Sequence, residues 1–164
     1  MNVVYNKTTL TTILLDNQTT AMTGGQPHPG SGITLKGKKA AKLNYEHLIR
    51  ALGVERVAIV DSYDLKKTEE IISRELISDQ PSVIIVRNPC ILRAKNTNNK
   101  SFQIRAHRCT HCKRCLQLGC LAVMSNGSRK PHIDRTRCVG CSLCKQICRV
   151  DAIEEIRDEV SQKH

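Results

Sequence analysis

Aromatic residues are nearly absent from this sequence. Only 2% of its 164 residues are aromatic: three tyrosines, one phenylalanine and no tryptophan. Hydrophobic residues still make up 40% of the chain, which is enough for a packed core and argues against wholesale disorder. Any core is therefore mainly aliphatic, and the length leaves room for one ordinary domain or two small ones.

Long apolar runs are also lacking. No stretch approaches the roughly 18 residues that are needed to span a bilayer. The N-terminal residues do not show a basic segment followed by an apolar one, as a signal peptide would. We therefore predict no membrane partner and a cytoplasmic location. In that reducing setting, clustered cysteines are more often metal or cluster ligands than disulfides.

Negative charge is scarce, and the formal net charge is +11. Such a balance fits a nucleic-acid partner, an acidic protein partner or plain solvated surface charge. Many basic residues stand among the cysteines, where they would compensate negatively charged metal centres: Arg105, His107, Arg108, Lys113, Arg114, Arg137, Lys145 and Arg149. We favour surface charge with local compensation and expect no nucleic-acid partner.

Eight of the nine cysteines lie within forty residues, in two similar blocks. The blocks read Cys109-x2-Cys112-x2-Cys115-x4-Cys120 and Cys138-x2-Cys141-x2-Cys144-x3-Cys148. A Cys-x2-Cys-x2-Cys loop lets three thiolates converge on one 4Fe–4S cluster. Zinc is the alternative, but zinc sites usually show two Cys-x2-Cys pairs or Cys/His mixtures. No histidine stands at ligand spacing here, and we expect His111 to be exposed.

The spacing resembles that of bacterial two-cluster ferredoxins, in which the last cysteine of each block ligates the other cluster. By this resemblance, one cluster is held by Cys109, Cys112, Cys115 and Cys148, and the other by Cys120, Cys138, Cys141 and Cys144. Two departures stand out. The usual proline after the last cysteine of a block is replaced by Leu121 and Arg149, and the first block has four residues before its last cysteine.

Before the cysteines, predicted strands alternate with predicted helices. The remnant of a helix is expected within 1–8, strands over 10–15, 56–60 and 82–86, and helices over 43–52 and 65–77, with Asp64 as an N-cap. This alternation predicts a parallel sheet, of which three strands would be only a part. Asp61 and Asp64 could be metal ligands, but turn and cap roles suit them better.

The predicted fold class is therefore an α/β fragment, a partial parallel sheet, followed by a small α+β domain like a bacterial ferredoxin. We predict domains over 1–93 and 102–164, joined by a polar linker over 94–101, with a terminal helix over 152–160.

Polar residues follow the first predicted strand. Asp16 and Asn17 end it, and a loop rich in glycine, proline and threonine runs over 18–32. Open α/β sheets bind ligands just beyond the carboxyl ends of their strands, and glycines allow close backbone approach. An ordinary surface loop fits the composition equally well. Cys90 lies outside the two blocks and is predicted to be a buried structural thiol.

Three segments, in order, resemble the C-terminal end of the large (alpha) subunit of the indolepyruvate ferredoxin oxidoreductases, a family of the 2-oxoacid:ferredoxin oxidoreductase superfamily. They are residues 16–30, residues 81–90 and the cysteine blocks with their four-residue gap. The resemblance covers nearly the whole chain. It implies that residues 1–93 are the C-terminal half of a domain that binds thiamine diphosphate.

The resemblance also implies cofactors and site residues. The cofactors are two 4Fe–4S clusters and thiamine diphosphate with Mg²⁺, of which this chain would form half a site. The Asn17 side chain and the Thr19 carbonyl would ligate Mg²⁺. The other expected cofactor-binding residues are Asp16, Met22 near the thiazolium, and Thr23, Gly24 and Gly25 near the diphosphate.

The family's reaction implies the partners. A 2-oxo acid loses CO2, coenzyme A accepts the acyl group, and the clusters pass electrons one at a time to an external ferredoxin. The remainder of the large subunit and a smaller beta subunit would be assembly partners. Only sixteen residues precede Asn17, so the family's Gly-Asp motif and catalytic glutamate are expected in a segment before this one.

We therefore expect the chain to be the terminal piece of a subunit that is inactive by itself. The alternative is a stand-alone, ferredoxin-like electron-transfer protein that keeps a vestigial fragment of a thiamine domain.

Overall fold

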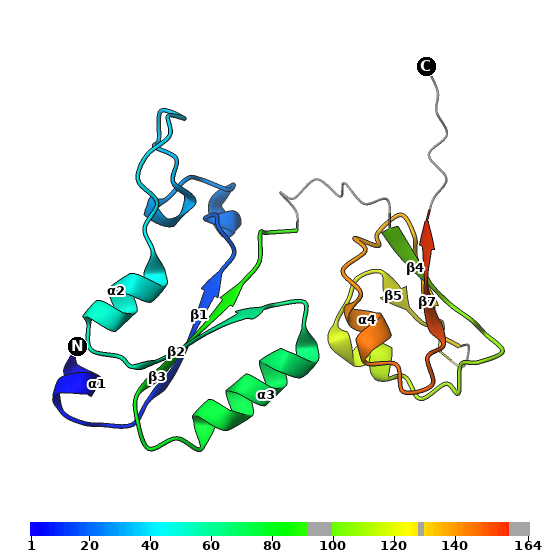
Figure 1. The fold of residues 1–164 in the computed structure, drawn as a ribbon. Coiled ribbons are helices and arrows are strands. Elements are labelled where there is room, and N and C mark those ends of the chain that lie inside the picture. Colours follow the sequence, from blue (N-terminus) through cyan, green and yellow to red (C-terminus); the bar gives the residue numbers. More distant parts are fainter. Residues whose placement is uncertain (92–99, 128–129, 158–164) are drawn as a thin grey trace. The chain divides into compact units, whose positions relative to one another are not determined.

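The computed structural model describes residues 1–91, 100–127 and 130–157. The chain forms two compact units, residues 1–94 (unit 1) and 95–164 (unit 2) (Figure 1). Residues 94–99 of the predicted linker lie outside the described residues. Lys100 and Ser101, the last two residues of that linker, instead begin a strand.

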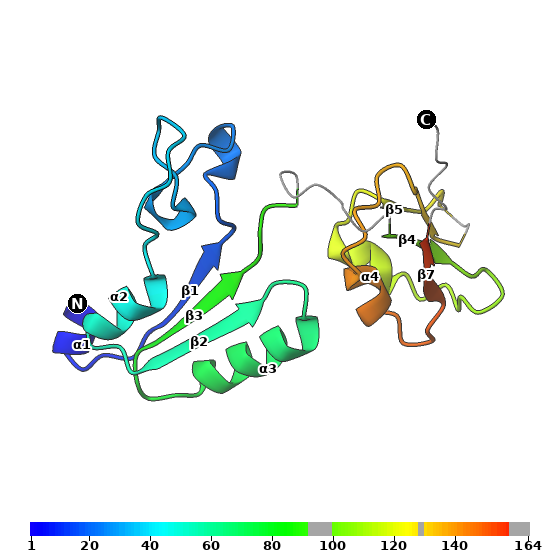
Figure 2. The ribbon, with the colours of Figure 1, turned by 45° about the horizontal axis from the view of Figure 1, so that its top comes forward.

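Unit 1 is built on a parallel sheet, as predicted. Strands β1 (Thr11–Asp16), β2 (Arg56–Asp61) and β3 (Ser82–Arg87) lie in the order β1-β3-β2, and all three run in the same direction (Figure 2). The register aligns the last residues of the strands, so that Asp16 and Asp61 both pair with Arg87. The carboxyl ends of all three strands therefore meet at one edge of the sheet.

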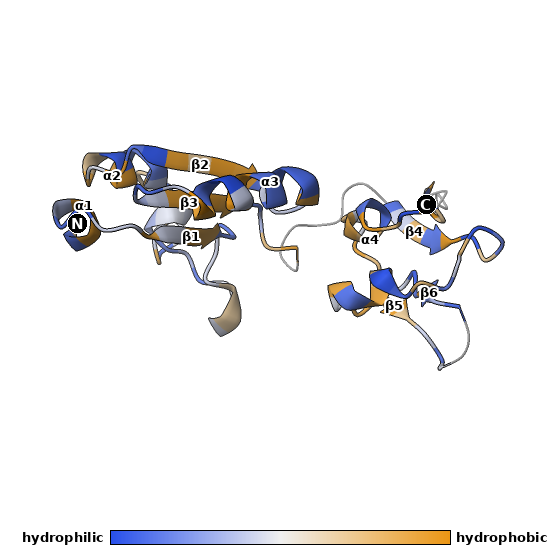
Figure 3. Ribbon diagram, turned by 90° about the horizontal axis from the view of Figure 1, so that it is seen from below, coloured by the Kyte–Doolittle hydropathy of each residue, from blue (hydrophilic) through white to orange (hydrophobic). Residues whose placement is uncertain are grey.

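Helices α1 (Asn2–Tyr5), α2 (Tyr45–Ala51) and α3 (Leu65–Leu76) accompany this sheet. The α3 helix packs Ile71 against Val60 and Ile84, and Figure 3 shows hydrophobic stretches along β2 and β3. Asp64 caps α3, as predicted, because its side chain accepts a hydrogen bond from the Lys67 N–H at 3.1 Å. Asp61 has the predicted turn role and accepts from the Tyr63 N–H at 2.8 Å.

Unit 2 consists of two small antiparallel sheets around a compact core. Strand β4 (Lys100–Ile104) pairs with β7 (Ile153–Arg157), and β5 (Val123–Met124) pairs with β6 (His132–Ile133). A 3-10 turn at Arg114–Leu118 and helix α4 (Leu143–Gln146) complete the unit. Phe102, Val123, Cys144 and Ile153 are the buried residues of its core.

The terminal helix predicted over 152–160 is wrong. Residues 153–157 form β7, and residues 158–160 lie outside the described part. The isoleucines at 153 and 156 fit a helical spacing, but the ladder with β4 is the stronger influence. Ile153, opposite Ile104, is only 1% exposed. Within the described residues, no helix is long and apolar enough to cross a membrane.

Candidate functional site

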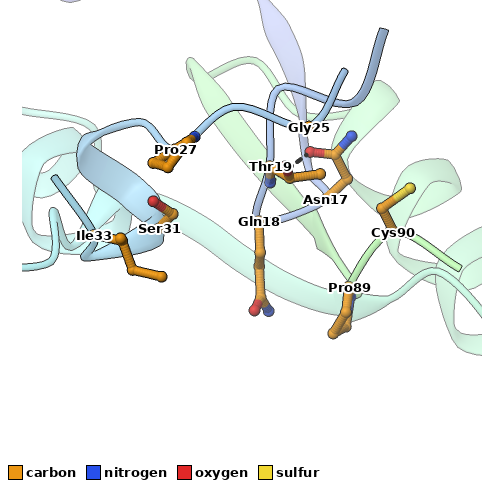
Figure 4. Close-up of a pocket in the computed structure, with 9 residues that line it drawn as sticks. All are labelled: Asn17, Gln18, Thr19, Gly25, Pro27, Ser31, Ile33, Pro89 and Cys90. Atoms are coloured by element: carbon orange, nitrogen blue, oxygen red, sulfur yellow. Dashed lines mark hydrogen bonds between the residues drawn. The ribbon is translucent and has the colours of Figure 1, made fainter. Parts of the chain in front are cut away.

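A cavity of about 330 Å³ lies at the carboxyl ends of β1 and β3 (Figure 4). It is lined by Asn17, Gln18, Thr19, Gly25, Pro27, Ser31, Ile33, Pro89 and Cys90. In Figure 4, residues 17–19 lie between Pro27, Ser31 and Ile33 on one side and Pro89 and Cys90 on the other. The cavity is therefore in the position where parallel sheets bind ligands.

The turn after β1 is fixed by its own hydrogen bonds. The Asn17 side-chain oxygen accepts from the Thr19 N–H at 3.1 Å, and the Asn17 carbonyl accepts from the Cys90 N–H at 3.0 Å. Gln18 adopts a left-handed conformation, with φ of 59°. These bonds hold the oxygen-bearing residues Asn17 and Thr19 at the cavity and join them to the segment that follows β3.

Asp16 is held in a different environment. It is 6% exposed, and its carboxylate forms an ion pair with Arg87 at 2.7 Å. The same carboxylate accepts a hydrogen bond from the Gln18 N–H at 3.2 Å. Asp16 is not among the residues that line the cavity, so it ties the end of β1 to β3 and supports the turn from behind.

Of the other residues expected to bind the cofactor, only one lines the cavity. Gly25, with φ of 78°, lines the cavity with Asn17 and Thr19. Met22 lies in a 3-10 turn (Ala21–Thr23) and is fully exposed, while the Thr23 hydroxyl bonds the Gln26 side chain at 2.6 Å. Neither these two nor Gly24 line the cavity. The structure thus brings together three of the seven residues.

Cys90 is half-buried and lines the cavity, so the prediction that this thiol is buried is wrong. Together with Pro89 it follows β3, which is the neighbour of β1 in the sheet. Sequence reasoning assigned Cys90 no place in the site, because the order of the strands cannot be read from their spacing. The resemblance did include residues 88–90, and this was the available signal.

One wall of the cavity is locked by His28, Gly30 and Tyr45. His28 Nδ1 accepts from the Gly30 N–H at 3.1 Å and lies 3.4 Å from the Tyr45 hydroxyl. A side chain at Gly30 would meet that hydroxyl, because a Cβ there would lie 2.2 Å from it. The Ser31 hydroxyl donates to the His28 carbonyl at 2.7 Å. Pro27 and Ser31, which line the cavity, are therefore positioned by this packing.

Four cysteines of unit 2 line a second cavity: Cys109, Cys112, Cys115 and Cys148. Burial raises the pKa of the Cys115 thiol, and the negative charges of the other three raise it further. The pKa of Cys112 is lowered, first by a hydrogen bond from the Arg114 backbone. Three residues from the first block and one from the end of the second thus share one environment.

The remaining four cysteines form a matching set. Cys144 is buried, and burial raises its pKa to about 12, with added contributions from the charges of Cys138, Cys141 and Cys120. All-thiolate donor sets of four suit iron–sulfur clusters, and they also occur in zinc sites. Among the described residues, no group of three or more His, Cys, Asp or Glu side chains is placed so that it could hold a single metal ion.

The cysteine sets are supported by the core of unit 2. Cys115, Cys120, Cys138 and Cys148 pack against the core around Phe102. The Ala152 N–H donates to the Cys148 sulfur at 3.3 Å. His111 is half-buried, and its Nε2 is buried without a partner among the described residues, so the expectation of an exposed histidine is wrong.

Two family models match the chain. Residues 1–86 match the thiamine pyrophosphate enzyme, C-terminal TPP binding domain, and residues 131–154 match the 4Fe-4S binding domain. The first match contains β1, β2 and nearly all of β3, but it ends before Pro89 and Cys90 of the cavity, and the second match contains the second cysteine block of unit 2. No solved structure matches the chain.

Curated relatives carry the name indolepyruvate oxidoreductase subunit IorA. The protein of Methanothermobacter thermautotrophicus is 37% identical over 155 residues, which is 94% of this chain and 25% of the relative. That of Pyrococcus horikoshii is 35% identical over 165 residues, or 96% of this chain and 25% of the relative. The chain therefore spans about a quarter of the length of the curated relatives it matches.

Proposed function

The chain belongs to the family of thiamine pyrophosphate enzymes, whose C-terminal cofactor-binding domain matches residues 1–86, and on this basis we propose that it is a component of an indolepyruvate ferredoxin oxidoreductase. One observation carries the proposal. A cofactor-domain cavity and eight grouped cysteines occur in one chain, and similarity to the IorA proteins extends over 94% of it.

In unit 1, the oxygens of Asn17 and Thr19 would hold Mg²⁺, which prefers such hard ligands. Thr23, Gly24 and Gly25 would lie near the diphosphate, Met22 near the thiazolium, and Asp16 behind the turn. When bound, thiamine diphosphate supplies the carbon nucleophile that opens the way to decarboxylation of a 2-oxo acid. The chain's own part is to fix the cofactor, through the turn at Gln18 and the wall formed by His28, Gly30 and Tyr45.

In unit 2, we assign one 4Fe–4S cluster to Cys109, Cys112, Cys115 and Cys148 and a second to Cys120, Cys138, Cys141 and Cys144. Support comes from the cavity that the first four cysteines line together. For the second set, the charges of Cys138, Cys141 and Cys120 add to burial in raising the pKa of Cys144. Such clusters carry electrons one at a time. The ligand crossover between blocks ties the two clusters to one small fold, which suits a relay.

The complete reaction needs partners. The remainder of the large subunit and a smaller beta subunit would complete the thiamine site and supply the catalytic residues. The 2-oxo acid and coenzyme A would bind to that assembly, and an external ferredoxin would take the electrons. This chain would then provide half of the thiamine site and the electron exit.

The test is co-expression of the chain with the remainder of the subunit and the smaller subunit, followed by anaerobic addition of indolepyruvate. We expect the visible absorption of the clusters to bleach when thiamine diphosphate, Mg²⁺ and coenzyme A are present. Asn17→Ala should abolish bleaching by indolepyruvate but not by dithionite, while Lys66→Ala in α3 should behave like the unsubstituted chain. If bleaching does not depend on thiamine diphosphate, the proposal is wrong.

A second candidate is favoured by the independence of unit 2, which has a core of its own around Phe102 and Ile153. Such a unit could serve as a stand-alone electron carrier. The same experiment separates the two functions. Clusters that accept electrons from a reductant but never from indolepyruvate, in any assembly, would support the carrier.

A further inference from the structure

The positive charge of the chain is concentrated in unit 2. Residues 95–164 contain fourteen Lys and Arg against six Asp and Glu, whereas residues 1–94 contain twelve against nine. Two oxidised clusters of about −2 each would lower the formal charge of unit 2 from +8 to about +4. Compensation of the clusters therefore accounts for only about half of the excess, and the remainder can act on a partner.

Several cations of unit 2 are engaged within the fold. Arg105 pairs with Glu154, Arg137 pairs with Asp134 at 3.3 Å, and Lys130 donates to the Ala106 carbonyl at 2.6 Å. By contrast, four other cations form no ion pair or side-chain hydrogen bond with any described residue: Lys113, Arg114, Lys145 and Arg149. Lys113 and Arg149 are exposed. Their charge is therefore available to solvent and to a partner.

Three of these four cations flank one cysteine set, whereas Lys145 follows Cys144 of the other set. Lys113 and Arg114 line the cavity of Cys109, Cys112, Cys115 and Cys148. Arg149 lies in the chain between Cys148 and Val150, which both line it. Cys112 is the one exposed cysteine of the nine, whereas Cys144 of the other set is buried. The first set is thus the one that comes to the surface, and it does so among unpaired positive charges.

We propose that the surface of Cys112, Lys113, Arg114 and Arg149, which we call the cation rim, is the docking site of an acidic electron-carrier protein. This inference rests on the proposed function, because it requires clusters in unit 2. Electron transfer slows steeply with distance, so the exit lies where a ligand sulfur reaches the surface. One electron passes from the reduced cluster to the oxidised centre of the carrier, and no proton or further reactant is needed.

Charge and composition favour a protein over a nucleic acid at the cation rim. Proteins that bind single strands stack bases on exposed aromatic rings. Phe102 is the sole Phe, Tyr or Trp of residues 95–164, and it is 2% exposed. A small set of cations around a redox ligand is instead suited to steering an oppositely charged protein, which accelerates association rather than strengthening the complex.

The test measures association of the anaerobically reconstituted chain with a purified acidic two-cluster ferredoxin as the probe. We expect the association rate to fall at least about tenfold between about 0.05 and 0.3 M salt. The double variant Lys113→Gln/Arg149→Gln should lower the low-salt rate about tenfold. Lys66→Gln/Lys67→Gln in α3 removes the same charge from unit 1 and should leave the rate unchanged.

The docking site would be overturned by an association rate that is insensitive to salt, by equal slowing in both double variants, or by equal binding of the basic protein cytochrome c. Displacement of the ferredoxin by duplex DNA would do the same, in favour of nucleic acid. Iron content, measured on the same samples, keeps the two inferences apart. About eight irons per chain without salt-sensitive association defeats the docking site alone, whereas a chain without iron defeats the proposed function. If the Lys113→Gln/Arg149→Gln variant loses iron, the salt dependence of the association rate of the unsubstituted chain still tests the docking site.

Discussion

The two units differ in what packs against their cores. Unit 1 buries apolar residues of a parallel sheet beneath α3, with Ile84 completely buried. Unit 2 has only short strands, and much of the material packed on its core is cysteine. Its stability should therefore depend on what the cysteines bind, whereas that of unit 1 should depend on its aliphatic packing.

Unit 1 also leaves part of its sheet uncovered. Ile13 and Leu15 of β1 lie on the same face as Ile84 and Val86, but they are 46% and 74% exposed. The α3 helix covers β2 and β3 on this face and contacts β1 only near its start, where the Thr11 hydroxyl donates to the Glu75 carbonyl at 3.1 Å, so Ile13 and Leu15 are left uncovered. Exposed apolar strand surface of this kind is a site for association, which agrees with the proposed assembly. From this difference we expect unit 1 to depend on a partner and unit 2 on a cofactor.

Removal of iron should have the largest effect, because it should unfold unit 2 and leave unit 1 folded. We expect chelation under anaerobic conditions to unfold unit 2, because the binding energy of a structural metal centre is part of its folding free energy. Hydrogen exchange read by mass spectrometry should then show full exchange in β4 and β7 and unchanged protection in β3. Equal protection of β4 and β7 with and without iron would show that unit 2 does not depend on its clusters.

The next largest effect should come from the core of unit 1. Ile84→Ala should lower the free energy of unfolding of this unit by about 2–5 kcal/mol, since it leaves a cavity beneath α3. Urea unfolding followed by hydrogen exchange should show the loss in β1–β3 while the iron content stays unchanged. The control is Ile77→Ala, at a side chain that is 87% exposed; a similar loss there would contradict the core that we describe.

Gly30→Ala should have a smaller effect, confined to the cavity wall. The added Cβ would clash with the Tyr45 hydroxyl, at a cost of about 1–3 kcal/mol in unfolding free energy. The Cβ would also lie 2.8 Å from His28 Cε1, but its nearest contacts are with Tyr45, so Tyr45→Ala in the same chain should recover part of the loss. Thermal unfolding of the two single variants and the double variant measures this coupling. Strict additivity would mean that the two residues do not interact.

The smallest expected effect is on the stability of unit 1 at acidic pH. Burial opposes ionisation of Glu75, but hydrogen bonds and charges from Arg56 and Arg74 outweigh it and lower the pKa of this carboxyl. A carboxyl whose pKa is depressed on folding stabilises the protein above its unfolded value, 4.5, and this contribution is lost as pH falls through the folded value. The stability of unit 1 should therefore decline below about pH 4.5, and Glu75→Gln should flatten that decline. An unchanged acid profile in the variant would refute this role.

Local patterns predicted much of the fold. The apolar runs around Ile13, Ile59 and Ile85 predicted three strands, and the cap at Asp64 predicted the start of α3, because these signals depend on near neighbours. The predictions that were wrong depend on pairing between segments that are far apart in the sequence. Residues 153–157 form a strand because β4 is there to pair with them, although their own spacing fits a helix. The order of β1 and β3 brings Cys90 to Asn17, and no local signal encodes that order.

The candidate sites likewise include features that the sequence predicted and features that depend on packing between distant segments. The two cysteine blocks were evident from their spacing, the grouping into ligand sets was predicted from the ferredoxin resemblance, and Cys148 lines one cavity with three cysteines of the first block. The cavity wall of His28 and Tyr45, and the burial of the Nε2 atom of His111, depend on packing between segments. Met22 and Thr23 show the converse: the resemblance places them at a cofactor, yet they do not line the cavity of this chain.

The central claim is that unit 2 holds two clusters through two sets of four cysteines, and iron content tests it most directly. Anaerobic reconstitution should give about eight irons and eight sulfides per chain. Cys112→Ser should remove about four irons, whereas Cys90→Ser, at a cysteine outside both sets, should remove none. A colourless chain that binds zinc in place of iron, or equal loss of iron in both variants, would contradict the account.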